Sequence, residues 1–159
     1  TEPCQCQWMT YGDSVVFHYS SQTGLLEHSF TRLADFSNPP RLVSCKDPLE
    51  EEGFRSGIFH LDDTSVVFAA SDALSHYVLM MYELSKSEEF ESELMELRMK
   101  QTSNSQLLQI AEKEKFCFAD DVLCPLLRSV DSEADFKELM ESLHTKRLID
   151  IDDYTLAIL

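Results

Sequence analysis

Leu61-Asp-Asp-Thr-Ser-Val-Val-Phe-Ala-Ala-Ser-Asp-Ala-Leu74 joins a strand pattern to a helix pattern, and this stretch decides the fold. Its centre, Ser65 to Ala70, is a short apolar run with β-branched residues, which is typical of a buried strand. Before this run, Asp62-Asp-Thr64 is a turn sequence, and Phe54 to Leu61 on its far side is a second strand pattern. We therefore predict a hairpin of two strands that leads, after Ser71, directly into a helix.

The sequence before this stretch is also strand-like. Short apolar and aromatic runs alternate with the turn sequences Gly12-Asp-Ser14 and Ser21-Gln-Thr-Gly24, and the three runs are Trp8 to Tyr11, Val15 to Tyr19 and Leu25 to Phe30. They predict a meander of three strands. Residues 34–53 predict a loop, because two consecutive prolines at positions 39 and 40 cannot continue a ladder of backbone hydrogen bonds.

The sequence after the stretch is mostly helical in pattern. Apolar residues recur at helix spacing at Leu74, Tyr77/Val78, Met81, Phe90, Leu94, Leu97, Phe136, Leu139/Met140 and Leu143. Ser103 to Gln106 and Ser132 to Asp135 resemble capping boxes, and Asp120 to Ser129 predicts a short helix. Tyr154 to Leu159 returns to a strand pattern. The predicted fold class is α+β, with antiparallel sheets packed with helices, and residues 1–159 form a single domain.

The composition excludes some classes of partner. The formal net charge is −16 in 159 residues, which disfavours nucleic acid and anionic membrane surfaces as partners. The five cysteines have no regular spacing, and no apolar run approaches the length of a membrane span. We therefore predict a soluble, cytoplasmic protein. The chain begins Thr-Glu-Pro without methionine and soon enters a strand pattern, so we expect that an N-terminal part is missing.

Three acidic motifs stand at predicted strand ends. They are Gly12-Asp13-Ser14 between two strands, Asp72 where a strand passes into a helix, and Asp150-Ile-Asp152-Asp153 before the last strand. Taken singly, they have ordinary interpretations as a turn, a helix cap and a charged loop end. Taken together, they predict that Asp72 and Asp152 meet at one rim of a sheet, where a hard divalent cation would relieve their repulsion.

The order of these motifs resembles that of the metal-dependent protein phosphatases of the protein phosphatase 2C family. The matching stretches are Tyr11 to Tyr19, Leu61 to Leu74 and Asp152 to Leu159, and they correspond to the C-terminal part of the family's domain. The resemblance implies part of an αββα sandwich and a binuclear Mg²⁺ or Mn²⁺ centre. It implies hydrolysis of phosphoserine and phosphothreonine in a phosphoprotein substrate. Asp72 and Asp152 match ligands of one metal, and Asp13 matches the aspartate that approaches a third metal.

The chain departs from the family pattern in its second motif. Ala73 replaces a glycine, Ser75 a tryptophan and His76 an aspartate, and Asp153 replaces an asparagine in the last motif. The upstream family motifs, including the remaining metal ligands and the phosphate-binding arginine, are absent from these residues. We therefore expect this chain alone to be inactive. The alternative is a diverged, non-catalytic module that binds a protein partner.

Two further expectations concern titratable groups. No lysine or arginine neighbours Asp13, Asp72 or Asp152 in sequence, so at least one of them should have a raised pKa without metal. His76 can ligate Mn²⁺, but a histidine in a first helical turn is more often exposed or capping. The other histidines show no sequence pattern of a serine or cysteine hydrolase.

Overall fold

The computed structural model describes residues 4–38, 43, 46 and 48–159. The strands are β1 (Cys4–Tyr11), β2 (Val15–Ser20), β3 (Leu25–His28), β4 (Phe54–Leu61), β5 (Ser65–Ala70) and β6 (Leu156–Ile158). The α-helices are α1 (Asp72–Ser85), α2 (Glu91–Met99), α3 (Ser103–Ala111), α4 (Cys124–Ser129) and α5 (Glu133–Thr145). Short 3-10 helices span Leu33–Ser37 and Glu51–Gly53, and a π-helix spans Phe118–Leu123 and runs into α4.

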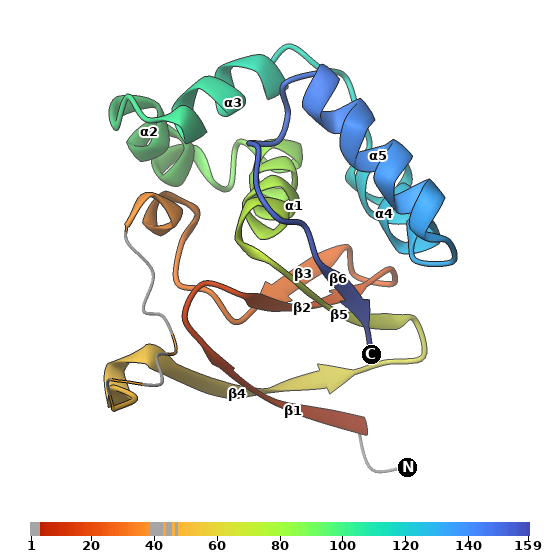
Figure 1. Ribbon diagram of the computed structural model, residues 1–159. Helices are drawn as coiled ribbons and strands as arrows, with labels where there is room; N and C mark the ends of the chain where they lie inside the picture. The colour runs from red at the N-terminus through yellow and green to blue at the C-terminus, as the bar shows by residue number, and fades with distance from the viewer. Residues whose placement is uncertain (1–3, 39–42, 44–45, 47) are drawn as a thin grey trace.

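These elements form three layers (Figure 1). A four-stranded antiparallel sheet, in the order β3-β2-β5-β6, is the middle layer. The helices cover one of its faces, with α1 closest to the sheet, and the antiparallel pair β1-β4 lies against the other face. The predicted α+β class with antiparallel sheets is confirmed.

Two of the predicted strand connections are wrong. β1 pairs with β4 rather than with β2, so the three-stranded meander does not form, although its second half, the antiparallel β2-β3 pair across Ser21-Gln-Thr-Gly24, is confirmed. β4 and β5 belong to different sheets, so the predicted hairpin does not form. Gly12-Asp-Ser14 and Asp62-Asp-Thr64 instead carry the chain from one sheet to the other. Gly12 has a φ of 83°, a backbone conformation that side chains disfavour, and its N–H donates to the Gly53 carbonyl.

The main core lies between the four-stranded sheet and the helices. Alternate residues of β2 and β5 point to this side, and Phe17 stacks on Phe68 with ring centroids 4.9 Å apart. α1 is buried on all sides, from Ala73 to Glu83. A helix that is buried all round fits only at the centre of a structure, which is why α1 is the helix around which the others pack.

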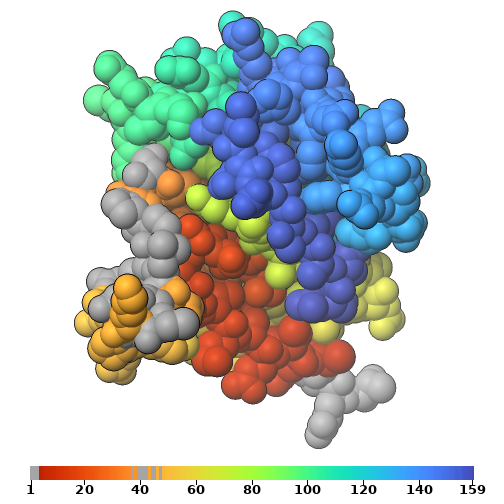
Figure 2. All heavy atoms as spheres, viewed as in Figure 1, coloured from red at the N-terminus to blue at the C-terminus, as the bar shows by residue number. Residues whose placement is uncertain are grey.

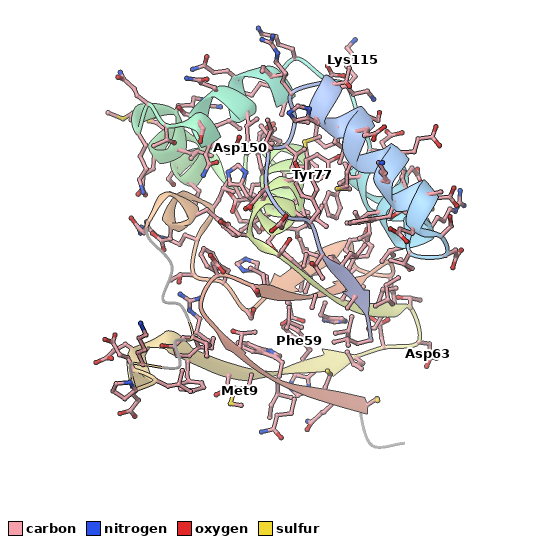
Figure 3. The ribbon with its side chains drawn as sticks, viewed as in Figure 1. Met9, Phe59, Asp63, Tyr77, Lys115 and Asp150 are labelled. Carbon is pink, nitrogen blue, oxygen red and sulfur yellow. The ribbon has the colours of Figure 1, made fainter. Side chains whose placement is uncertain are left out.

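A second, smaller core lies between the two sheets. Phe59 of β4 is buried and contacts Trp8 of β1 and the imidazole of His18 in β2, with centroids 5.6 and 5.5 Å away. Figure 3 shows Phe59 pointing toward the four-stranded sheet, whereas Met9 points away from it. The Trp8 ring covers Gly57, its partner in the β1-β4 ladder; a Cβ at Gly57 would come within 2.6 Å of that ring.

The two predicted capping boxes have different outcomes. α3 begins at Ser103 itself, with Thr102 at the N-cap and no side-chain cap bond, so the prediction at Ser103 is wrong. Ser132 is the N-cap of α5, and its hydroxyl accepts a hydrogen bond from the Asp135 N–H at 3.3 Å, as predicted. Within the described residues, no helix is both long enough and apolar enough to cross a bilayer.

We expect Ser132→Ala to destabilise the protein by about 1 kcal/mol, because it removes the side-chain acceptor of the Asp135 N–H in the first turn of α5. Chemical denaturation followed by circular dichroism measures this loss. Ser142→Ala, at an exposed position in the last turn of the same helix, is the matched control and should change stability by less than about 0.5 kcal/mol. Equal losses in the two variants would contradict a capping role.

Candidate functional site

The strand register aligns the three acidic motifs at one rim of the four-stranded sheet. Val15 at the start of β2 is opposite Ala70 at the end of β5, and Ala70 is also opposite Leu156 at the start of β6. Asp13 lies two residues before Val15, and Asp72 lies two residues after Ala70. The antiparallel ladder therefore places strand ends that are far apart in sequence side by side.

Hydrogen bonds fasten the segment before β6 to the start of α1. The Ser71 hydroxyl donates to the Asp153 carbonyl at 3.1 Å and accepts from the Thr155 N–H at 3.0 Å. The Ser71 N–H also donates to the Thr155 carbonyl at 3.0 Å. Figure 2 shows this C-terminal segment, in dark blue, running down the front face beside the N-terminal strands. These bonds hold the segment that carries Asp152 close to Asp72.

Two cavities meet at Asp72. The first cavity, of about 260 Å³, is lined by Asp13 and Asp72 together with residues of the Leu33–Ser37 helix and β4. The second cavity, of about 340 Å³, is lined by Asp72, His76, Asp150 and Asp152. The structure thus brings Asp72 and Asp152 to one cavity and Asp13 and Asp72 to the other.

The electrostatics of Asp72 reflect this setting. Burial at the helix start, together with the negative charges of Asp13 and Asp152, raises its pKa to about 6. The expectation that one carboxylate of this set has a raised pKa is therefore confirmed for Asp72. A half-buried carboxylate that faces two others favours a compensating cation.

The donor set suits a hard cation in its chemistry. Asp13, Asp72 and Asp152 offer carboxylate oxygens, which Mg²⁺ and Mn²⁺ prefer, and no described ion pair engages any of them. The described residues contain no group of three or more His, Cys, Asp or Glu side chains that could hold a metal ion as they are placed.

His76 differs from its sequence expectation. It is neither exposed nor a cap: it is 3% exposed, and its ring meets the edge of Phe36 with centroids 5.6 Å apart. Burial lowers its pKa to about 4, so the imidazole is neutral at physiological pH. The expectation failed because α1 is enclosed from Ala73 to Glu83, which includes the position of His76 in its first turns.

Arg55 is a residue of this site that the sequence motifs do not indicate. It comes from β4, in the other sheet, and lines the first cavity together with Asp13 and Asp72. Its guanidinium donates to the Gly12 carbonyl at 3.2 Å and lies over the Phe30 ring, 4.8 Å from the centroid. An arginine inside a strand pattern carries no local signal, and only the packing of the two sheets brings it here.

The sequence patterns also did not predict a chain of hydrogen bonds at the opposite end of the sheet. His18 Nε2 lies 2.7 Å from Ser65 Oγ, and His18 Nδ1 lies 2.8 Å from Glu27 Oε2. The order hydroxyl, imidazole, carboxylate is that of a hydrolase nucleophile set. Here Ser65 Oγ also accepts from the Asp62 N–H, so this chain of bonds fastens the β4-β5 turn to β2 and β3.

Searches against protein-family models, curated proteins and solved structures find no match for this chain.

Proposed function

We propose that this chain is the C-terminal part of a Mg²⁺- or Mn²⁺-dependent protein phosphatase that hydrolyses phosphoserine and phosphothreonine. The observation that carries the proposal is the meeting of Asp13, Asp72 and Asp152 at two cavities that share Asp72. Two antiparallel sheets in face contact, with helices on one outer face, are also compatible with part of an αββα sandwich. The motif order along the chain points to the same family.

In this proposal Asp72 and Asp152 hold one metal ion, and Asp13 approaches a further one. Paired divalent ions supply a hydroxide near neutral pH and neutralise charge on phosphoryl oxygens. The half-buried Asp72 carboxylate lies where both cavities meet, so it orients what binds in either of them. The remaining ligands of a binuclear centre are expected on an N-terminal part that these residues do not include.

A second candidate function is a non-catalytic module that binds a protein partner. The burial of His76 supports it, because that position supplies no carboxylate to the acidic rim and its imidazole is enclosed by apolar groups. Met9 and Ile58, on the outer side of the β1-β4 pair, are 70% and 51% exposed and could contact such a partner. Metal binding separates the two candidates, since only the phosphatase needs it.

Asp72→Asn tests the proposal on this chain through two opposite effects. We expect the wild-type chain to bind Mn²⁺ weakly, with a Kd of about 10⁻⁴–10⁻³ M. The variant should have an affinity for Mn²⁺ that is lower by about tenfold or more, because a charged oxygen ligand is removed. Electron paramagnetic resonance of free Mn²⁺ measures both. Without metal the variant should instead be more stable at pH 7, by about 1 kcal/mol after solvent screening.

The pH dependence of that gain is the internal check. The folded pKa of Asp72, about 6, lies above the ordinary aspartate pKa of 3.8, so wild-type stability falls as pH rises through this interval. The gain from asparagine should therefore vanish near pH 4. Asp63→Asn, in the β4-β5 turn away from the start of α1, is the matched control and should change neither property (Figure 3). Mn²⁺ binding that is equal in wild type and Asp72→Asn would refute the metal site.

A further inference from the structure

The first cavity joins carboxylates to one guanidinium. Its acidic lining residues are Asp13, Asp35, Glu52 and Asp72, and Arg55 is its one cationic residue among those described. Asp35 already has a partner, because it forms an ion pair with Arg32 at 3.2 Å. Arg55 forms no ion pair with any described carboxylate. A guanidinium in acidic surroundings without an ionic partner is available to a ligand.

The Arg55 side chain is held in position before any ligand arrives. The Gly12 carbonyl accepts one of its N–H groups at 3.2 Å, and the Phe30 ring supports the plane of the guanidinium. Phe30 is itself fixed by stacking on Phe36, with centroids 4.0 Å apart. One of the five guanidinium N–H groups is used in this way, and the others can donate to a ligand.

The chemistry of the ligand follows from the two charges. A planar guanidinium binds phosphate or carboxylate oxygens through a fork of two N–H groups. An anion cannot enter beside Asp13 and Asp72 unless a divalent cation neutralises them. The cavity therefore suits a group that carries a double negative charge and bridges a metal ion and an arginine, and a phosphate monoester has both properties.

We propose that Arg55 is the phosphate-binding residue of the first cavity and that it binds a phosphate monoester next to the metal held at Asp72. This inference rests on the proposed function and deepens it by naming the residue that recognises the phosphoryl group. Arg55 reaches the cavity from β4, so the sheet opposite the aspartates supplies the anion-binding half of the site.

The test is a titration with inorganic phosphate, the product of the proposed reaction, and with O-phosphoserine as a second probe. Nuclear magnetic resonance follows the Arg55 Nε–Hε signal and the Gly12 amide in the 159-residue chain, with and without saturating Mg²⁺. We expect both probes to shift these signals only when Mg²⁺ is present. Arg55→Ala should weaken phosphate binding about tenfold or more, and Arg55→Lys, which keeps the charge without the fork, by less.

Several controls make each outcome decisive. Arg98→Ala removes an arginine that pairs with Glu112 on the helices and should leave phosphate binding unchanged. Arg55→Ala should also bind Mg²⁺ more tightly, because a positive charge leaves an acidic cavity. If Mg²⁺ binds but phosphate binding is absent, or is equal in wild type and Arg55→Ala, the inference on Arg55 is overturned and the metal site stands. If neither Mg²⁺ nor Mn²⁺ binds, the proposed function fails first.

Discussion

Asp152→Asn is expected to lower phosphatase turnover by about 10³-fold or more in a longer protein that carries the expected N-terminal part. The amide keeps the shape of the side chain but removes the charge that a hard cation requires. Phosphoryl transfer depends almost entirely on positioning and on neutralising charge, so losing a metal ligand should cost most of the rate. Hydrolysis of p-nitrophenyl phosphate with Mn²⁺ measures this loss.

Asp153→Asn is a close control, because it changes the neighbouring carboxylate on the same segment. The Asp153 side chain is not among the residues that line either cavity, and its backbone carbonyl, which accepts from Ser71, is retained. Turnover should therefore stay within about threefold of wild type. The 159-residue chain alone should hydrolyse the same substrate no faster than buffer. A folded longer protein that is inert with both Mg²⁺ and Mn²⁺ would favour the non-catalytic module.

Glu83→Gln is expected to have the largest effect on stability. Glu83 is 4% exposed on α1, and its Oε2 has no hydrogen-bond partner among the described residues. Burial, with a smaller contribution from the nearby charge of Glu93, raises its pKa from 4.5 to about 8. A folded pKa above the unfolded value means that wild-type stability is greatest below about pH 4.5 and falls as pH rises to about 8.

The advantage of glutamine should therefore grow with pH. We expect the stability difference between Glu83→Gln and wild type to increase by about 3 kcal/mol between pH 5 and 8, since each pKa unit corresponds to about 1.4 kcal/mol. Urea denaturation at a series of pH values measures it. Glu91→Gln, at an exposed position of α2, should show no such trend. Parallel pH profiles for wild type and Glu83→Gln would show that Glu83 ionises normally in the folded protein.

The sequence predicts the strands and helices better than it predicts how the strands pair. Gly12-Asp-Ser14 and Asp62-Asp-Thr64 have the composition of hairpin turns, and composition does not say whether the next strand returns beside the last one. Here both segments cross between sheets. The fit of Trp8 against Gly57 and of Phe59 between the sheets favours the crossing, and these are contacts between distant residues. Local propensity contains no information on them.

The candidate site was predictable to the extent that it lies at strand ends. Asp13, Asp72 and Asp152 stand beside turn and cap positions, where an acidic residue is visible against an apolar strand. Arg55 and His76 were not predictable in the same way. Arg55 lies within a strand pattern, where a polar residue between apolar ones is ordinary and indicates no site. The enclosure of His76 depends on Phe36, which lies on a segment distant in sequence.

The exchange of strands between the sheets has a consequence for how the chain folds. Because β1 leads into β2 and β4 leads into β5, pairing β2 with β5 also places β1 antiparallel beside β4, with Tyr11 opposite Phe54 and Leu61 opposite Cys4. A single loop closure, that of the long segment before β4, therefore allows both ladders to form, and its entropy cost is incurred only once. Because both ladders depend on the same loop closure, we expect the two sheets to form and unfold as a single cooperative unit. The high contact order of that closure makes it the slow step of folding.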